Sequence, residues 1–215
     1  MSVTPYIQYH LFRMLHIDNL ERVLREGMYA PNARFDPAYV NIGDEALIAQ
    51  RGEFNVPIAP GGVLSDYVPF YFGGCSPMLL NIKTGYRGIR KRSQSEIIYL
   101  CTHIETIIKR CPEWCFTDGH AKDKLTAYYN QLDGLALIDW DTVTNKYWSS
   151  TPEDPDKMRR KQAEFLVRTH VPTTCLSGAI VHDEAAEAKA RGIMNSVGII
   201  LPIHIDKKHN YYYND

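Results

Sequence analysis

Short apolar stretches alternate with polar segments rich in proline and glycine along the whole chain. Runs of four to nine apolar-rich residues bounded by turn residues are typical of strands. The predicted strands cover residues 11–16, 67–72, 78–82, 96–102, 114–117, 164–170, 178–182 and 197–205, with 135–140 as a strand or a buried turn. Pro69 removes a backbone donor, so the strand that contains it is expected near a sheet edge.

Helical spacing appears in a few short segments with clear start and stop signals. Asp18, with Glu21 three residues later, forms a capping-box-like start, and Gly27 stands where a helix-ending glycine belongs. Asp183 caps a later segment that is expected to end at Gly192. The predicted helices cover residues 18–27, 44–50, 104–110, 122–132, 156–161 and 183–190. Because strands and short helices are mixed irregularly, the pattern predicts an α+β fold.

Two long polar segments, residues 30–45 and 141–156, contain prolines and are predicted to be loops. Loops of this length in a compact domain are often functional. The chain has 215 residues without an internal repeat or linker, so residues 1–215 are predicted to form one domain. The longest apolar run, 197–205, is far shorter than the roughly 18 residues of a membrane span, and residues 1–9 lack a secretory-signal pattern. We therefore expect a cytoplasmic protein with no membrane partner, and the odd count of 5 cysteines favours reduced thiols.

The charges are balanced, with 24 Lys and Arg against 25 Asp and Glu, which argues against a strongly basic nucleic-acid-binding class. Basic residues nevertheless gather in two groups: Lys83, Arg87, Arg90, Lys91 and Arg92, and then Lys157, Arg159, Arg160 and Lys161. With Tyr86, Tyr147 and Trp148 nearby, these groups could bind a single strand by phosphate contact and stacking, or they could be solvated faces. The cysteines and histidines of 101–120 lack a paired Cys-x2-Cys, so no metal site is expected.

Four stretches carry residues suited to chemistry. His16 closes a strand ahead of a capped helix, residues 66–80 combine aromatic residues with a Gly pair and a Ser-Pro step, and His120 follows the Asp-Gly turn at 118–119. Near 160, Gln162 and Glu164 are two positions apart, so on a strand both would point to one face while Phe165 points into the core. Taken singly, each stretch is also explained as a strand end, an edge strand with its turn, a surface loop or a solvated edge.

Taken in chain order, these stretches resemble the DarT family of bacterial DNA ADP-ribosyltransferase toxins, from about residue 12 to 205. The resemblance rests on Arg-x-x-His-x-x-Asn-Leu from Arg13, an isolated Arg51, Asp-Tyr-Val-Pro-Phe-Tyr-Phe…Ser-Pro-Met from Asp66, Phe-Thr-Asp-Gly-x-Ala from Phe116, and Arg-Arg-x-Gln-Ala-Glu-Phe-Leu-Val from Arg159. Two departures are visible: Ser65 stands where His is expected, and Gly73-Gly74-Cys75 replaces a turn that contains Pro or Arg.

The resemblance implies an ADP-ribosyltransferase-like fold with two small packed sheets and NAD as co-substrate in the cleft between them. It implies that Glu164 and Arg51 are catalytic. The residues implied to bind NAD are Arg13, His16, Ile17 through its backbone, Asn19 and Arg51. The residues expected at the substrate are Met78, His120, Tyr147 and Trp148, the last two in the 141–161 recognition segment. The implied partners are single-stranded DNA, modified on a thymidine ring nitrogen, and a DarG-like macrodomain antitoxin.

The chemistry agrees with this resemblance. Breaking the bond between nicotinamide and ribose develops positive charge on the sugar, which a nearby carboxylate stabilises without a metal. A single strand exposes the base edge that a duplex hides. Two other readings stay open: an ADP-ribosyltransferase acting on guanine, RNA or protein, and a non-catalytic module that binds single-stranded nucleic acid. Glu164 and Arg51 count against the second.

Overall fold

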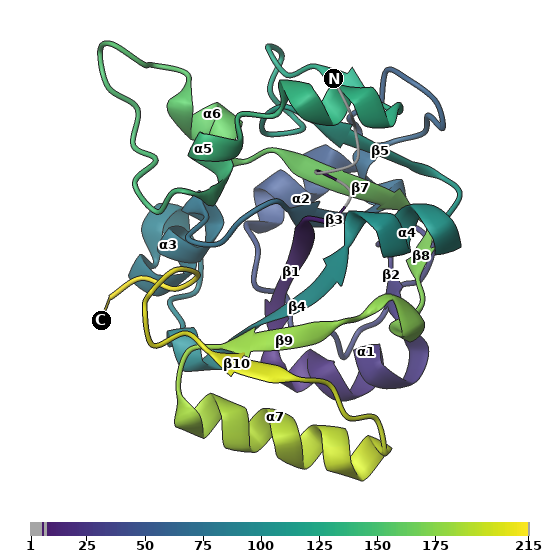
Figure 1. Cartoon of the computed structure of the whole chain (residues 1–215), viewed down its shortest axis with the longest axis vertical. Helices are drawn as coiled ribbons and strands as arrows, with labels where there is room; N and C mark the ends of the chain where they lie inside the picture. The colour runs from purple at the N-terminus through teal and green to yellow at the C-terminus, as the bar shows by residue number, and fades with distance from the viewer. Residues whose placement is uncertain (1–5, 7, 215) are drawn as a thin grey trace.

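The computed structural model describes Tyr6 and residues 8–214, and its main feature there is a mixed eight-stranded sheet in the order β10-β9-β4-β1-β3-β7-β5-β6 (Figure 1). The strands of this sheet are β1 (His10–His16), β3 (Tyr67–Tyr71), β4 (Ile97–His103), β5 (Trp114–Thr117), β6 (Tyr128–Tyr129), β7 (Glu164–Arg168), β9 (Gly178–Val181) and β10 (Ile203–Ile205). A small second sheet pairs β2 (Met28–Tyr29) with β8 (His170–Val171). The α+β class predicted from the sequence is confirmed.

Seven α-helices of the described chain surround the sheet. They are α1 (Leu20–Glu26), α2 (Glu45–Arg51), α3 (Pro77–Thr84), α4 (Ile104–Arg110), α5 (Trp140–Thr144), α6 (Lys157–Lys161) and α7 (Glu184–Val197). Helix α7 packs against β9, β10 and α1 at one end of the molecule, and α5 packs against α6 at the other (Figure 1). Among the described residues no helix is both long enough and apolar enough to cross a membrane.

A seam divides the large sheet between β1 and β3. These two strands share one register pair in the described chain, Phe12 with Tyr71, whereas β1 pairs with β4 over seven positions and β3 with β7 over five. Pro69 explains the seam. Its carbonyl accepts a 3.2 Å hydrogen bond from the Arg13 guanidinium on β1, and since the N and C=O of one residue face the same neighbour, its missing N–H also faces β1.

The expectation of two separate packed sheets is therefore corrected. Hydrogen bonding joins the two halves into one sheet, and the opening lies along the seam between them. The prediction that the Pro69 strand lies near a sheet edge is wrong: β3 lies inside the sheet between β1 and β7, and Pro69 weakens only its pairing with β1. The sequence did not show that β1 would stand beside Pro69, because strand order depends on contacts between distant segments.

Alternating side chains bury both faces of the sheet. On β1, Leu11 and Leu15 enter the main core, while Phe12 and Met14 enter a second cluster with Tyr212. On β7, the predicted inward direction of Phe165 and Val167 is confirmed, since both enter the main core, and Leu166 enters a third cluster on the opposite face. Glu164, two positions before Leu166, shares that opposite face.

Four predicted elements differ in the structure. The strand expected at 197–205 is confined to β10, residues 203–205, because α7 continues to residue 197 and an irregular segment follows it. Residues 78–82 belong to helix α3, because the Ser76 hydroxyl accepts a 3.2 Å hydrogen bond from the Leu79 N–H and Pro77 occupies the first turn, a standard helix start. The helix expected at 122–132 is absent: turns and β6 occupy its place. Helix α7 continues past Gly192 to Val197 and ends at Gly198, whose φ is 74°.

Candidate active site

A cavity of about 690 Å³ lies at the seam, within the size range of small-molecule sites. Its walls come from β1, β3, the end of α2, the start of β7 and the 39–44 part of the long loop. Five of the residues singled out from the sequence line it: Arg13, Arg51, Met78, His120 and Glu164. Segments that are far apart in the chain therefore meet at one opening.

The centre of this cavity is an ion pair between Arg51 and Glu164. The guanidinium donates through both terminal nitrogens to the two carboxylate oxygens, at 3.2 and 3.0 Å. Arg51 is the last residue of α2, whose start is capped by Asp44, and Glu164 is the first residue of β7. A two-point contact of this kind fixes the orientation of both side chains.

Glu164 keeps its negative charge although it is only 3% exposed. Burial raises its pKa, but the Arg51 charge, His120 and the hydrogen bonds from Arg51 and the Ala121 N–H outweigh that effect, so the pKa lies below its usual value. Burial likewise opposes the charge of Arg51, and Glu164 more than compensates, so the pKa of Arg51 is raised. The site therefore presents a buried, ionised carboxylate in a cavity open to a ligand.

His120 lies close enough to Arg51 and Glu164 for both charges to affect its pKa. Burial lowers its pKa, with Glu164 and Arg51 acting in opposite directions, so the imidazole is neutral at pH 7. Its backbone N–H donates to the Arg159 carbonyl at 2.9 Å, which holds it on the turn after β5. A neutral imidazole beside a carboxylate is suited to accept a proton.

Tyr71 is a cavity residue that the sequence did not single out. It pairs with Glu164 in the β3–β7 register, and its hydroxyl donates to the Met78 sulfur at 3.6 Å. Burial and the Glu164 charge raise its pKa, so the phenol stays protonated. The motif at 66–72 was visible in the sequence, but the register that sets Tyr71 opposite Glu164 was not.

The other residues that the resemblance implies for NAD binding do not line the cavity. His16 is buried: its Nδ1 accepts from the Asp18 N–H at 3.2 Å and its Nε2 is 3.4 Å from Glu96. Ile17 is buried too. Asn19 bonds both backbone groups of Val40 at 2.9 Å, which holds the long loop whose residues 39 and 41–44 line the cavity. Their role toward NAD stays a prediction.

Tyr147 and Trp148, predicted at the substrate, also lie outside the cavity lining. Tyr147 is 72% exposed. The Trp148 indole donates to the Tyr213 hydroxyl at 2.7 Å, and that hydroxyl lies 2.6 Å from the Cys75 carbonyl as its acceptor. Residues 141–144, predicted as loop, belong to α5, so the loop covers 145–156. The contacts of Tyr213 tie this loop to the segment that precedes α3.

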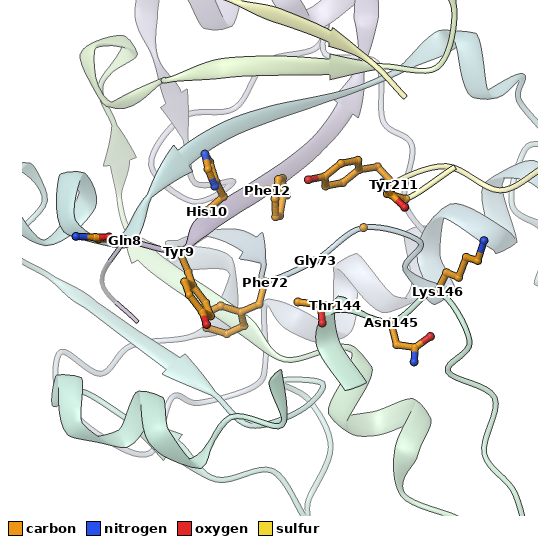
Figure 2. Close-up of a pocket in the computed structure, with 12 residues that line it drawn as sticks. Gln8, Tyr9, His10, Phe12, Phe72, Gly73, Thr144, Asn145, Lys146 and Tyr211 are labelled. Atoms are coloured by element: carbon orange, nitrogen blue, oxygen red, sulfur yellow. The ribbon is translucent and has the colours of Figure 1, made fainter. Parts of the chain in front are cut away.

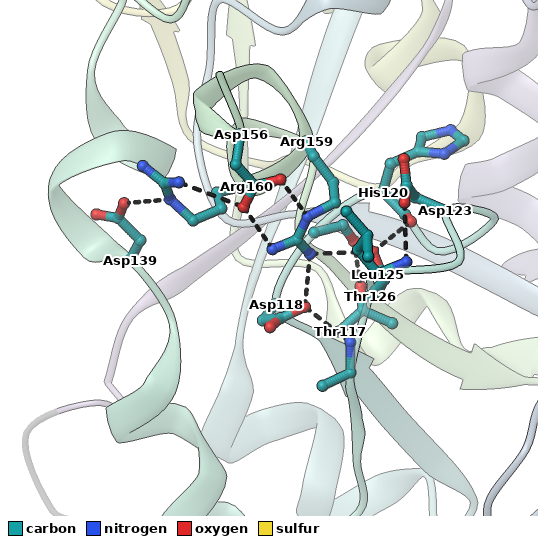
Figure 3. Close-up of polar contacts among 12 residues, drawn as sticks. Thr117, Asp118, His120, Asp123, Leu125, Thr126, Asp139, Asp156, Arg159 and Arg160 are labelled. Atoms are coloured by element: carbon teal, nitrogen blue, oxygen red, sulfur yellow. Dashed lines mark hydrogen bonds and ion pairs between the residues drawn. The ribbon is translucent and has the colours of Figure 1, made fainter. Parts of the chain in front are cut away.

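The basic run 157–161 is largely neutralised by the chain itself (Figure 3). Arg159 pairs with Asp118 at 2.8 Å and with Asp156 at 2.7 Å. Arg160 pairs with Asp139 at 2.8 Å and with Asp154 at 2.7 Å, and the buried Lys161 ammonium donates to two backbone carbonyls. Most cations of this basic group are therefore already paired within the protein. They are poorly available to bind phosphate.

Gln162 lines the cavity beside Glu164, as predicted, but not because both lie on one strand. Gln162 ends α6, and its amide donates to the Met158 carbonyl at 3.0 Å. The glycine pair at 73–74 allows two segments of the chain to approach closely. A Cβ on Gly73 would lie 2.0 Å from the Val143 carbonyl and one on Gly74 2.5 Å from Tyr211 Cα, so both glycines allow close packing of the chain on itself.

A second hollow of about 590 Å³ lies beyond this glycine pair (Figure 2). Tyr9, His10, Phe12, Tyr211 and Lys146 line it, and no carboxylate among the described residues does. It therefore lacks a group that stabilises positive charge. The described chain also holds no cluster of three His, Cys, Asp or Glu side chains that could bind a metal.

Comparison of the sequence with known proteins identifies the family to which the chain belongs. A family described as ssDNA thymidine ADP-ribosyltransferase, DarT, matches residues 12–213. A DNA ADP-ribosyl transferase of Escherichia coli O127:H6 is 34% identical over 195 residues, covering 90% of this chain and 89% of that protein. One from Thermus aquaticus is 29% identical over 212 residues, covering 97% and 90%.

Solved structures agree. Thermus sp. 2.9 DarT in complex with ADP-ribosylated ssDNA superposes with a TM-score of 0.86 at 30% identity, covering 96% of this chain and 97% of that one. The same protein in complex with NAD+ gives 0.81, covering 96% and 98%. Thermosipho africanus DarTG in complex with ADP-ribose gives 0.75 at 19% identity, covering 96% of this chain and 52% of that one, a likeness of fold.

Proposed function

Since the chain belongs to the DarT family and is an NAD-using ADP-ribosyltransferase that acts on thymidine in single-stranded DNA, we propose that the seam cavity is where the transfer takes place. One observation carries this proposal: an ionised, buried carboxylate, Glu164, faces a cavity of suitable size and is held by Arg51. In this proposal NAD occupies the opening between the two halves of the sheet.

Glu164 stabilises the positive charge that develops on the ribose as its bond to nicotinamide breaks. Its fixed orientation matters, because a carboxylate that is already held in place needs no reorganisation during the reaction. Arg51 holds that carboxylate and offers its planar fork to the pyrophosphate or to a base carbonyl. Arg13 lines the NAD side of the cavity, and Asn19 holds the loop that supplies residues 39 and 41–44 to its wall. By the family resemblance, His16 contacts the ribose of NAD and the Ile17 backbone contacts its nicotinamide amide.

The acceptor side is formed by Met78 and His120. A bond forms between the ribose carbon and the thymine ring nitrogen, and the proton of that nitrogen must leave. The neutral His120 takes this proton, while the Met78 side chain packs against the base. Trp148 and Tyr147 belong to the loop that recognises the strand.

A DarG-like macrodomain antitoxin that removes the modification is the partner proposed from the family. The cytoplasm is the proposed location, in agreement with the five free cysteines of the described chain.

The test is an assay with NAD and three single strands whose candidate acceptor is thymine, uracil or guanine, with modified bases located by mass spectrometry. We expect modification of the thymine strand, and a loss of about 10²–10³ in rate for Glu164→Gln. Glu184→Gln, on the surface of α7, is the matched control and should keep the wild-type rate. Modification of the guanine strand alone, or full activity of Glu164→Gln, would contradict the proposal.

A further inference from the structure

The segment after α3 forms an exposed basic patch at the mouth of the cavity. We define the rim patch as Tyr86, Arg87, Arg90 and Lys91. Arg87 lines the cavity that contains Glu164 and also lines an adjoining groove of about 540 Å³, whose wall includes Arg90. The patch therefore begins at the active-site cavity and continues outward along the surface.

The arginines of this patch differ from all the others in the described chain. Arg87 and Arg90 have neither an ion pair nor a hydrogen bond to any described residue. The remaining arginines each have a carboxylate, hydroxyl or backbone carbonyl partner. Arg92, next to the patch, pairs with Glu96 and bonds the Asn41 carbonyl, so it is already occupied. Two guanidinium forks are thus available to an external anion.

An aromatic ring stands among these charges. Tyr86 is 60% exposed, and the Arg87 guanidinium lies over its ring, 5.6 Å from the ring centroid. Arg87 itself has φ 57° and ψ 29°, a left-handed conformation that is uncommon for a residue with a long side chain. Gly85 and Gly88 on either side also have positive φ, so the turn holds Tyr86 and Arg87 out in solvent.

Exposed arginines beside an exposed aromatic ring match the chemistry of single-stranded nucleic acid, whose phosphates bind cations and whose bases stack on rings. The opposite basic run, 157–161, is bound up in its own ion pairs. The groove also has two acidic residues, Asp44, whose side chain caps α2, and the exposed Glu45 in the first turn of that helix. A strand could leave the cavity past the rim patch or past the 157–161 run. The unpaired arginines and the exposed Tyr86 ring favour the path over the rim patch.

We propose that the rim patch is an accessory binding site for the DNA strand flanking the target base, in which Arg87, Arg90 and Lys91 bind phosphates and Tyr86 stacks on a base. This rests on the proposed function of the cavity. It goes further by assigning a path to the part of the strand that does not react.

The test compares Arg87→Gln/Arg90→Gln/Lys91→Gln with a variant that loses three exposed cations that line neither the cavity nor the groove, Lys109→Gln/Lys207→Gln/Lys208→Gln. Binding of labelled strands of about 3 and about 15 nucleotides is measured by fluorescence anisotropy against salt. For the long strand, we expect the rim variant to flatten the log–log salt slope by about 2, which corresponds to three phosphates at about 0.7 each. The control should keep the wild-type slope, and the short strand should bind both variants alike.

Tyr86→Ala should weaken binding of the long strand by about tenfold, while Tyr86→Phe, which keeps the ring, should not. An unchanged slope in the rim variant, or an equal flattening in the control, would overturn the proposal. These readouts are binding measurements. If the wild-type protein bound the long strand through the patch but failed to modify thymine, the proposed function would fall and the rim site would stand.

Discussion

The ionised state of Glu164 depends on three donors that reach it from two different segments. Arg51 supplies two hydrogen bonds and the Ala121 backbone supplies the third. Without them, burial alone would favour the protonated acid. The same contacts therefore maintain the charge that the proposed transfer reaction needs and link that charge to the stability of the fold.

This link predicts how Glu164 makes stability depend on pH. Its folded pKa is below its unfolded value, so the unfolded chain binds more protons in acid, and the stability that the carboxylate contributes is present above about pH 4.5 and lost as the pH falls below it. Glu164→Gln should be less stable at pH 7, by about 3–5 kcal/mol, because Arg51 is left buried without its partner.

Urea unfolding at pH 7 and at pH 4 measures this effect. The wild type should lose more stability between the two pH values than Glu164→Gln does, since the variant has no carboxylate to protonate at that position. Parallel losses in the two proteins would show that Glu164 does not contribute to the acid dependence.

At the scale of elements, the chain end connects three segments. The Tyr213 hydroxyl receives the Trp148 indole N–H at 2.7 Å and lies 2.6 Å from the Cys75 carbonyl. The Gln94 side chain bonds both backbone groups of Tyr213 at 2.8 Å. One hydroxyl therefore connects the 145–156 loop to the residues that lead into α3, the helix that carries Met78.

We expect Tyr213→Phe to weaken the interaction with single-stranded DNA and to leave the affinity for NAD unchanged. Loss of this hydrogen bond should raise the KM for a single-stranded oligonucleotide by about two- to tenfold, with kcat and the Kd for NAD little changed. Steady-state kinetics with each substrate varied in turn separates these quantities.

Tyr211→Phe is the matched control, because within the described chain the Tyr211 hydroxyl makes no hydrogen bond. Equal kinetic effects of the two substitutions would mean that the Tyr213 hydroxyl has no special role. A change in NAD affinity alone would place Tyr213 on the other side of the site.

At the scale of the whole molecule, all five cysteines are buried and none is in a disulfide, although the Cys111 and Cys175 thiols are hydrogen-bonded to each other. Burial raises the pKa of Cys75 to about 11 and the pKa of Cys101 and Cys115 to about 12. A buried thiol that stays protonated is unreactive, since the thiolate is the nucleophile. Thiol chemistry therefore reports on opening of the fold.

Ellman's reagent at pH 8 should accordingly find almost no fast-reacting thiol in the native protein and all five after denaturation in guanidinium. The slow reaction of the thiols in native buffer should follow the rate of unfolding. A thiol that reacts at once in the native protein would show that its region opens locally.

The elements that could be predicted from the sequence are those whose signals lie within a few residues of one another. The glycine at 27 and the alternation of β7 were predicted correctly, and the motifs in chain order identified the family. The cap predicted at Asp18 is wrong: Asp18 lies inside a 3-10 turn that precedes α1, and Asn19 is the residue before the helix. The start of α3 was missed although its Ser-Pro signal was present, because the apolar run after it also fits a strand. The direction of Glu164 away from the core was equally predictable, from the two-residue period of a strand.

Only the tertiary structure decided which distant groups meet. Arg51 and Glu164 are 113 positions apart, and their pairing depends on how the chain between them folds. The same holds for the basic residues: the sequence shows two similar groups, and the fold pairs one with Asp118, Asp139, Asp154 and Asp156 while leaving Arg87 and Arg90 exposed. Local sequence determines the conformation of a segment through caps, turns and alternation, whereas partners are chosen by packing over long separations, where strand order and register decide what stands opposite what.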